Sequence, residues 1–503
     1  MYTAKTRSYA TIGIDALTVE IEVHVSAGLP AFNIVGMAET AVRESRERVR
    51  SAILNSNFDF PARRITVNLA PADLPKQGGG FDLAIAIAVL TATKQLPQPT
   101  EHQYSYAGEL ALSGKLRAVR GMLPIAVAST KENRALICAA DSNLQVGLLG
   151  AESLVYAANT LLDVCCHLRK NPLLPTLQET GKLSDSSIDS GAANLDLNDI
   201  QGQNSAKKAL EIAAAGHHNL LFVGPPGAGK SMLAKRISSI LPSLDRREAL
   251  ETAAIYSISG KARDCVFTPP VRFPHHSASS VSLVGGGSSP SPGEVSMAHN
   301  GVLFLDELPE FGPKVLEGLR EPLENGEISI SRANHQSLFP AYFQLVAAMN
   351  PCPCGYFGSA RCDCSPERVI RYQRRISGPL LDRIDMQIQV ELPDPTSLLR
   401  AKPAAQESSS EVKQRVLEAR YQQLNRQGKT NDKLNPEELT HFAPLTQESE
   451  ALLRQAMEKL ELSARGLHKV LRVARTIADL EKQEFGISHI KQALGFRERK
   501  MLR

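Results

Sequence analysis

The eight residues 224–231, Gly-Pro-Pro-Gly-Ala-Gly-Lys-Ser, constrain this chain more than any other segment. They follow the apolar run 219–223 and precede residues 232–237, which have a helical pattern. Glycines let successive backbone N–H groups and a helix N-terminus point at one anion, so such a loop between a strand and a helix binds phosphate. Lys230 would reach the β- and γ-phosphates, and the hydroxyl of Ser231 would bind the bridging Mg²⁺. The segment therefore predicts a nucleotide site formed by Gly224, Pro225, Pro226, Gly227, Ala228, Gly229, Lys230 and Ser231.

A second motif supplies the carboxylates that such a site needs. Residues 301–307 form an apolar run that ends in Asp306 and Glu307. A buried strand would deliver Asp306 to the Mg²⁺ and place Glu307 where it can polarise a water for attack on the γ-phosphate. The run could also be an ordinary core strand with capping acids. The next expected strand, 344–349, ends in Asn350, whose amide could orient the attacking water.

The chain divides into several domains, because 503 residues exceed what one hydrophobic core organises. Residues 1–168 mix β-rich and helical stretches and predict an α+β domain. Strands and helices alternate over 197–392, which is typical of an α/β layer with a parallel sheet. Residues 411–426, 447–460 and 467–482 have helical periodicity, so the C-terminal part 411–503 is predicted to be all-α. The polar, Pro- and Ser-bearing segments 169–196 and 393–410 are predicted to be linkers.

Composition excludes several classes of protein. No apolar run approaches about 18 residues and no basic-then-apolar leader begins the chain, so we expect a soluble, cytoplasmic protein without a membrane partner. The net charge is only +4, so a role on nucleic acid has to come from local placement of basic side chains.

Four of the eight cysteines fall within thirteen residues, as Cys352, Cys354, Cys362 and Cys364. Two C-x-C pairs this close favour tetrahedral thiolate ligation of a structural Zn²⁺. Reduced free thiols and a redox pair are the alternatives. The scattered Cys138, Cys165, Cys166 and Cys265 are interpreted as small hydrophobic residues.

The phosphate loop, the Asp306-Glu307 strand and Asn350 together resemble the AAA+ ATPases, which use ATP and Mg²⁺. That resemblance implies a ring whose active sites lie between subunits. Residues 380–385 look like the arginine-finger segment of these proteins, with Arg383 reaching the nucleotide of the neighbouring subunit. Arg383 could instead form a solvated ion pair with its flanking aspartates.

The same resemblance assigns residues outside the sheet. Residues 463–468 look like the second sensor, with Arg465 contacting the γ-phosphate from the helical lid, and Arg472 is the rival assignment. Ile200 and Gly202 lie in a segment that resembles the part packing against adenine.

Further motifs narrow the family. An insert over 273–300 precedes the Asp306-Glu307 strand, and residues 326–332 and 337–339 alternate like the two strands of a hairpin. With the Cys-Pro-Cys-Gly element, this set closely resembles the magnesium-chelatase-like ATPases of the ComM (YifB) family over essentially the whole chain. The resemblance implies an ATP-driven hexameric DNA motor for branch migration and helicase activity during integration of transforming DNA, with recombination proteins as further partners.

Candidate DNA contacts follow from the pore-facing position that the resemblance gives the hairpin. Basic or hydrogen-bonding side chains there could track phosphates without reading sequence. We expect Arg332 and His335 in the hairpin, and His275 and His276 in the insert, to make such contacts. The histidines could instead stabilise the insert by local hydrogen bonds.

The first domain resembles Lon-type proteases and the ribosomal S5-type fold. Residues 75–82 are similar to the segment of Lon that carries the nucleophile, and 107–110 match a following strand. Gly80 occupies the nucleophile's position, and residues 120–123, Arg-Gly-Met-Leu, lack the base lysine. Without a Ser-Lys dyad the domain is predicted to serve binding or assembly rather than proteolysis. A magnesium-chelatase-type motor subunit and a protein-remodelling ATPase remain the alternative functions.

Overall fold

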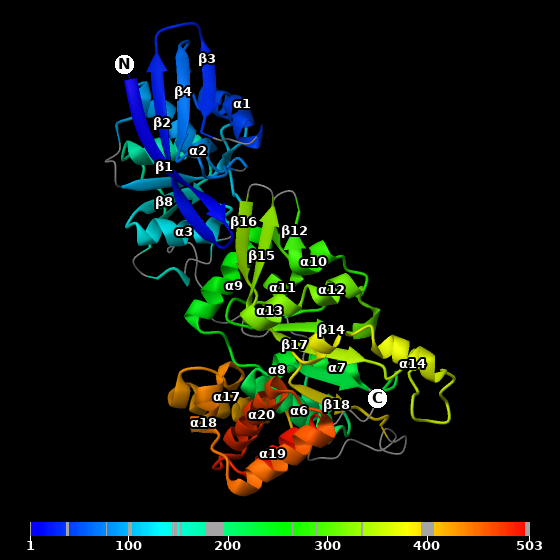
Figure 1. Cartoon of the computed structure of the whole chain (residues 1–503). Helices are drawn as coiled ribbons and strands as arrows, with labels where there is room; N and C mark the ends of the chain where they lie inside the picture. The colour runs from blue at the N-terminus through cyan, green and yellow to red at the C-terminus, as the bar shows by residue number, and fades with distance from the viewer. Residues whose placement is uncertain are drawn as a thin grey trace. The chain divides into compact units, whose positions relative to one another are not determined.

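The computed structural model describes residues 2–36, 40–76, 78–98, 103–142, 144, 148–150, 153–177, 195–263, 265–287, 290–332, 335–393 and 407–497. They form two compact units (Figure 1). The first unit contains residues 1–188 and 246–264, and the second contains 189–245 and 265–503.

The first unit is an α+β structure, as the sequence predicts. Its larger sheet has the order β1-β2-β4-β3, in which only β3 and β4 are parallel, and its smaller sheet is β5-β8-β9, all parallel. Helix α2 (Asp82–Ala92) is apolar on every side and fully buried against β1 and β2. The other elements of this unit are β1 (Tyr2–Ile12), β2 (Asp15–Ser26), β3 (Ala31–Val35), α1 (Thr40–Asn55), β4 (Arg64–Ala70), β5 (Tyr104–Ala107), β6 (Glu109–Leu110), β7 (Leu116–Arg117), α3 (Met122–Lys131), β8 (Ala135–Ala139), β9 (Val155–Ala158) and α4 (Leu161–Leu168).

Helix α9 (Arg246–Ser259) also belongs to the first unit, although its sequence lies inside the interval 197–392 assigned to the α/β layer. It packs against α3. The carbonyl oxygen of Ser257 accepts a hydrogen bond from the Gly121 backbone at 3.0 Å, and its hydroxyl accepts one from the Leu123 backbone at 3.2 Å. Gly121 and Leu123 lie in the segment 120–123, which the sequence comparison aligned with the part of Lon that carries the base lysine.

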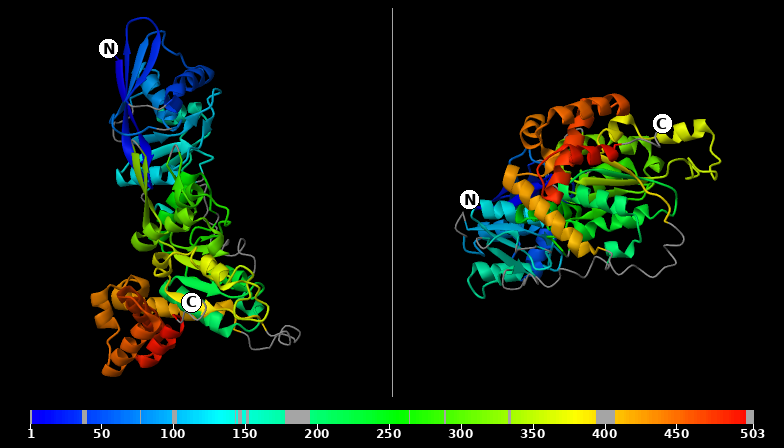
Figure 2. Two further views of the ribbon diagram at one scale, coloured as in Figure 1. Left: turned by 45° about the vertical axis from the view of Figure 1, so that its right-hand side comes forward. Right: turned by 90° about the horizontal axis from the view of Figure 1, so that it is seen from below.

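The second unit is built on a five-stranded parallel sheet with the order β11-β14-β17-β10-β18. Its three central strands are fully buried and read as continuous apolar runs, which is what a parallel sheet covered on both faces requires. Helices α6 and α7 pack against it (Figure 2). The elements of this layer are η2 (Leu197–Asp199), α6 (Asn204–Gly216), β10 (Leu220–Val223), α7 (Lys230–Lys235), α8 (Ile237–Ile240), β11 (Val271–Arg272), β14 (Val302–Leu305), η3 (Leu308–Glu310), β17 (Gln344–Met349), α14 (Pro366–Gln373), α15 (Gly378–Leu381) and β18 (Met386–Gln389).

An insert and a hairpin interrupt this layer around β14. The insert comprises α10 (Ser280–Val284), β12 (Gly285–Gly286), β13 (Ser291–Pro292) and α11 (Glu294–Met297). After α12 (Pro313–Glu317) and α13 (Arg320–Asn325), strands β15 (Glu327–Arg332) and β16 (His335–Pro340) pair antiparallel in the expected hairpin.

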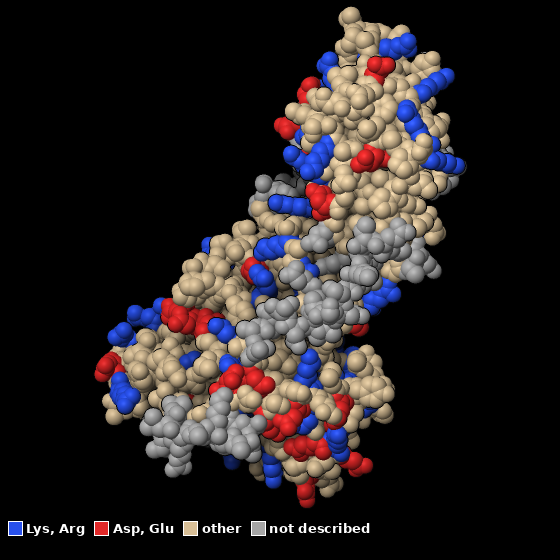
Figure 3. Space-filling model, turned by 180° about the vertical axis from the view of Figure 1, so that it is seen from behind, with Lys and Arg blue, Asp and Glu red and all other residues tan. Residues whose placement is uncertain are grey.

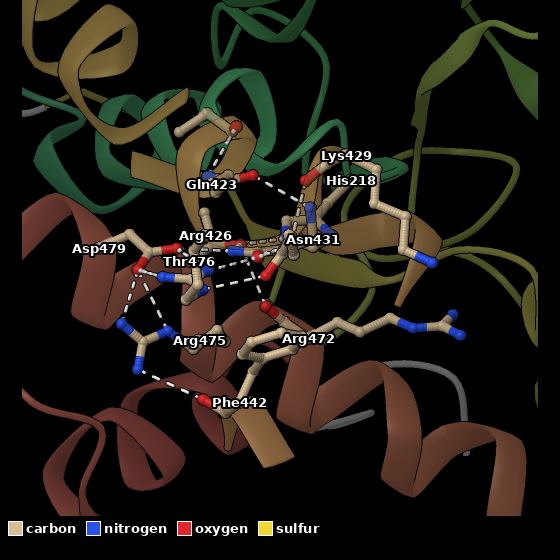
Figure 4. Close-up of polar contacts among 12 residues, drawn as sticks. His218, Gln423, Arg426, Lys429, Asn431, Phe442, Arg472, Arg475, Thr476 and Asp479 are labelled. Atoms are coloured by element: carbon tan, nitrogen blue, oxygen red, sulfur yellow. Dashed lines mark hydrogen bonds and ion pairs between the residues drawn. The ribbon is translucent and has the colours of Figure 1, made fainter. Parts of the chain in front are cut away.

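The C-terminal part is a helical lid, and a buried polar network fastens it to the end of α6 (Figure 4). Asp479 is buried and accepts two hydrogen bonds from the Arg426 guanidinium, at 2.6 and 3.0 Å. Thr476 bridges the lid to the core, because its hydroxyl meets His218 Nε2 at 2.7 Å and accepts a bond from Asn431 at 2.9 Å. The lid consists of α17 (Ser409–Gln427), η4 (Asn431–Lys433), α18 (Pro436–Phe442), α19 (Gln447–Leu460), α20 (Ala464–Glu481) and α21 (Ile487–Gly495).

Basic and acidic side chains are interspersed on the face shown in Figure 3. Within the described residues, none of the helices has the length and apolarity needed to cross a bilayer.

Candidate nucleotide-binding site

The phosphate loop lies between β10 and α7, as the sequence predicts. Gly227 and Gly229 have φ angles of +80° and +88°, and a Cβ at either would meet nothing within 4 Å. Glycine is therefore needed at both positions for the left-handed backbone conformation, which directs successive N–H groups toward one point. Gly224 is required for space, because a Cβ there would lie 2.2 Å from the Val390 carbonyl oxygen.

Lys230 begins α7 and lies at the centre of the site. Its Nζ donates hydrogen bonds to the carbonyl oxygens of Gly224 (2.6 Å) and Pro225 (2.8 Å) and to Asn350 Oδ1 (3.0 Å). Burial lowers the pKa of Lys230, while Asp306 and Glu307 act in the opposite direction. The contact confirms that the ends of β10 and β17 bring Lys230 and Asn350 together.

The two acids at the end of β14 point to different partners. Asp306 Oδ2 accepts a hydrogen bond from Ser231 Oγ at 2.5 Å. Glu307 adopts a left-handed backbone with φ of +50°, an uncommon conformation for a non-glycine residue that concentrates at functional sites. Its side chain is 54% exposed, and its carboxylate lies 3.3 Å from His276 Nδ1.

These residues fit ATP and Mg²⁺. A cavity of about 350 Å³ opens over the loop and is lined by residues 226–232, Asp306, Glu307, Met349 and Asn350. The glycine cradle and Lys230 would hold the phosphates. Ser231 and Asp306 offer adjacent oxygen ligands of the kind that Mg²⁺ prefers.

Arg383 lies elsewhere, beside a second cavity of about 660 Å³ in the same unit. Its guanidinium is 14% exposed and pairs with Glu324. It also donates to the carbonyl oxygens of Arg320 (3.1 Å) and Pro379 (2.9 Å). Arg383 is therefore largely buried rather than solvated, and it does not line the phosphate-loop cavity of its own chain.

Arg465 also lines the second cavity, where it donates to Glu324 Oε1 at 2.5 Å. The sequence analysis expected this side chain at the γ-phosphate. The structure does not bring it to the phosphate loop of its own chain, because the network around Asp479 fixes α20 with its N-terminus toward Glu324. The rival Arg472 lines the same cavity and donates to the Leu434 carbonyl oxygen at 2.8 and 2.5 Å.

The segment assigned to adenine lies beside the loop. Ile200 is buried, and its carbonyl oxygen accepts a bond from Lys207 at 2.5 Å. Gly202 has a φ of +65° and open space around its Cα. Neither residue lines the phosphate cavity, so their role at adenine stays a prediction. Sequence reasoning missed Gln203, whose amide donates to the carbonyl oxygens of Ala228 (3.4 Å) and Glu391 (2.6 Å) and so ties this segment to the loop.

The four clustered cysteines converge, with all four sulfurs within 4.8 Å of one another. Sγ–Sγ distances are 3.3 Å for 352–354, 3.6 Å for 354–362 and 3.9 Å for 352–362. A tetrahedron with Zn–S bonds of about 2.3 Å has edges of about 3.8 Å, so the thiols fit this metal. A hydrogen bond from the Tyr356 backbone lowers the pKa of Cys354 to about 6. The cluster adjoins the phosphate loop, because a Cβ on Gly355 would lie 2.4 Å from Pro226 Cδ.

The candidate DNA contacts are only partly described. Arg332 and His335 pair as backbone at the end of the hairpin, and their side chains lie outside the described residues. His275 Nδ1 lies 2.8 Å from Ser277 Oγ, which is the local contact that the alternative interpretation expects. His276 lies beside Glu307 instead, so its position favours the nucleotide site.

The five-stranded parallel sheet, its phosphate loop and acid pair, the insert, the hairpin and the helical lid define an AAA+ protein of the magnesium-chelatase type. Family models agree: residues 196–398 match "Magnesium chelatase, subunit ChlI", 21–143 match "Subunit ChlI of Mg-chelatase" and 406–497 match "Magnesium chelatase, subunit ChlI C-terminal". The chain is 48% identical to competence protein ComM of Haemophilus influenzae over 499 residues, covering 97% of this chain and 96% of that protein. It is 46% identical to the protein YifB of Escherichia coli, with the same coverage. The chain therefore belongs to the ComM (YifB) family.

The chain also has a weaker, partial likeness to a Lon-type protease. The chain is 27% identical to Lon protease 2 of Bacillus subtilis over 186 residues, which cover 31% of this chain and 32% of that protein. In the structure, the atoms nearest to a Cβ built on Gly80 are the methyl groups of Val119, at 3.7 and 3.9 Å.

Proposed function

We propose that this protein is an ATP-hydrolysing ring motor that acts on DNA, with branch migration and helicase activity during integration of transforming DNA. One observation supports assembly of several copies of the chain into a ring. The phosphate loop and Arg383 line two different cavities, so one chain holds only part of an AAA+ active site. A second copy that presents its Arg383 would complete the site. A cytoplasmic hexamer with no membrane partner is the form that we propose.

The chemistry follows from the positions of the side chains. Lys230 and the loop N–H groups bind and orient the phosphates. Glu307 accepts the proton of the attacking water, and Asn350, at the end of the adjacent strand, orients that water. His276 can hold the Glu307 carboxylate in place. Bound Mg²⁺ would neutralise charge that develops on the phosphates.

Steady-state ATP turnover with and without single-stranded, duplex and branched DNA tests the proposal. We expect single-stranded or branched DNA to raise turnover. A turnover indifferent to every DNA would contradict the DNA-motor role. It would favour a protein-remodelling ATPase, or a magnesium-chelatase-type motor subunit, which the matching family descriptions suggest. ATP-dependent cleavage of peptides by purified protein would contradict the non-proteolytic assignment of the first unit.

Replacing Arg332 with alanine tests the hairpin as the DNA contact. A side chain that neutralises one phosphate of a single strand changes the slope of log Kd against log salt concentration by about 0.7. We expect Arg332→Ala to weaken DNA binding and lower that slope by about this amount, measured by fluorescence anisotropy across a salt series. An unchanged slope would contradict the phosphate contact. Arg361→Ala, in the cysteine loop, is the matched control.

We also propose that Cys352, Cys354, Cys362 and Cys364 hold a structural Zn²⁺. Elemental analysis of purified protein is expected to give about one zinc per chain, and Cys352→Ser should lower that content because a buried ligand is lost. Cys265→Ser lies outside the cluster and should keep the metal. Well-folded native protein with less than about a tenth of that zinc would contradict the site.

A further inference from the structure

The second cavity joins parts of the chain that have separate roles in the proposed motor. Its lining includes Arg383 from the segment before β18, Arg465 from the lid, and both ends of the hairpin. Gly326 immediately precedes β15, and Tyr342 follows β16. The side chains expected to act on a nucleotide and the base of the DNA-contact candidate therefore share one cavity.

Glu324 is the carboxylate that both arginines contact. Its Oε2 accepts from Arg383 and its Oε1 accepts from Arg465. The hydrogen bond from Arg465 and the nearby charge of Arg383 lower the pKa of Glu324, so it is an anion at neutral pH. In this arrangement, both arginines therefore form ion pairs with a carboxylate of their own chain.

The hairpin connects directly to this carboxylate. Glu324 lies at the C-terminal end of α13, Gly326 follows the helix with a left-handed φ of +72°, and β15 starts at the next residue. The two ends of the hairpin are tied together, because the Ala341 N–H donates to the Gly326 carbonyl oxygen at 2.7 Å. A displacement of the hairpin would therefore reach the C-terminal end of α13, which carries Glu324.

The other end of the hairpin is anchored in the lid. The Tyr342 hydroxyl donates to Asp432 Oδ2 at 2.8 Å, and its ring stacks on His217 with centroids 4.5 Å apart. Lys433 Nζ lies 3.7 Å from the centre of the same ring. Tyr342 is therefore held on several sides, which anchors the C-terminal end of the hairpin, and the connection through Gly326 to α13 is the route by which hairpin movement would reach Glu324.

We propose that Glu324 is a latch that holds Arg383 and Arg465 until the hairpin moves, and then releases them to the triphosphate of a nucleotide bound by a second copy of the chain. A triphosphate and a carboxylate compete for the same guanidinium donors, because both are anions that accept paired hydrogen bonds. The latch rests on the proposed function and adds to it the residue through which DNA binding would stimulate hydrolysis.

Glu324→Gln tests the latch, with Glu317→Gln as the matched control. Glu317 also lies in the helical segment before the hairpin and also pairs with an arginine, Arg320, at 2.5 Å. We expect Glu324→Gln to raise DNA-free ATP turnover by about two- to fivefold, the range that loss of exposed charge pairs represents, and to shrink the stimulation by DNA correspondingly. Glu317→Gln should keep the native rates. In Glu324→Gln/Arg383→Ala the gain should disappear.

The possible results of these measurements distinguish a failure of the latch from a failure of the proposed function. Native basal turnover and native stimulation in Glu324→Gln would overturn the latch, and so would a loss of turnover in a variant whose thermal unfolding matches the native protein. Native protein that no DNA stimulates would contradict the DNA role. A gain of turnover in Glu324→Gln would then still support the latch on the arginines.

Discussion

Arg383→Ala is expected to lower ATP turnover by about 10³–10⁵, the contribution of an arginine that stabilises charge on the transferred phosphate. The reason lies in its position: Arg383 lines the second cavity, away from the phosphate loop of its own chain, where Glu324 and two carbonyl oxygens hold it, and in the proposed ring it would act on the nucleotide of a neighbouring subunit. Binding of ATP by the phosphate loop of the same chain should persist. Steady-state phosphate release and binding of a fluorescent ATP analogue measure the two effects.

Mixing two variants shows whether Arg383 acts on the nucleotide of its own chain or on that of a neighbouring chain. Lys230→Ala removes the phosphate contact of one subunit but keeps its Arg383, whereas Arg383→Ala keeps the phosphate loop. Neither variant should turn over ATP alone, and a mixture should regain turnover at interfaces that combine the two intact halves. Failure of the mixture, in rings shown to contain both chains, would mean that Arg383 acts within its own chain. Arg375→Ala, an exposed arginine paired with Glu310, is the control.

Glu307→Gln is expected to lower ATP turnover by about 10²–10⁴, which is the usual contribution of a general base. Glutamine keeps the size of the side chain but cannot accept the proton of the attacking water. Nucleotide binding should remain, because the phosphates are held by Lys230 and the loop. Phosphate release and binding of the same analogue check this separation.

Glu310→Gln is the matched control for this change, since Glu310 lies three residues further on and pairs with Arg375 at 2.8 Å. It should keep native turnover. A Glu307→Gln protein within about tenfold of the native rate would remove Glu307 from the role of base. Loss of nucleotide binding in that variant would indicate a structural role for the left-handed turn at this residue.

The parts of the site that sequence could predict are those governed by local rules. A glycine-rich loop between an apolar run and a helical pattern predicts a strand, a phosphate-binding loop and a helix in succession. The structure has this arrangement in β10, the loop and α7. Asn350 was expected to end a strand at the site, and the structure places its Oδ1 3.0 Å from Lys230 Nζ, as the shared edge of parallel strands allows. The tight cysteine spacing likewise predicted convergence of the four thiols, which the structure confirms. Bound zinc stays a prediction.

The parts that sequence could not predict depend on contacts between distant segments. Arg465 was expected at the γ-phosphate, but its position follows from Asp479 and Arg426, whose pairing is invisible in the sequence. His276 was expected on DNA, and only the folded insert places it beside Glu307. Glu324 belongs to none of the motifs that the sequence analysis used. A carboxylate two residues before the expected hairpin was the available signal, and it was not specific.

The docking of α9 with the first unit has a consequence for how this chain can be divided. The main chain passes from one unit to the other at residues 188–189, again at 245–246 and a third time at 264–265. No single cut separates the units, and a fragment that begins at residue 197 would carry α9 without α3, leaving Ala249, Ala253 and Ile255 without their native surroundings. The second unit is thus interleaved in sequence with the first, so an isolated fragment of either unit has to be built from two stretches of the chain.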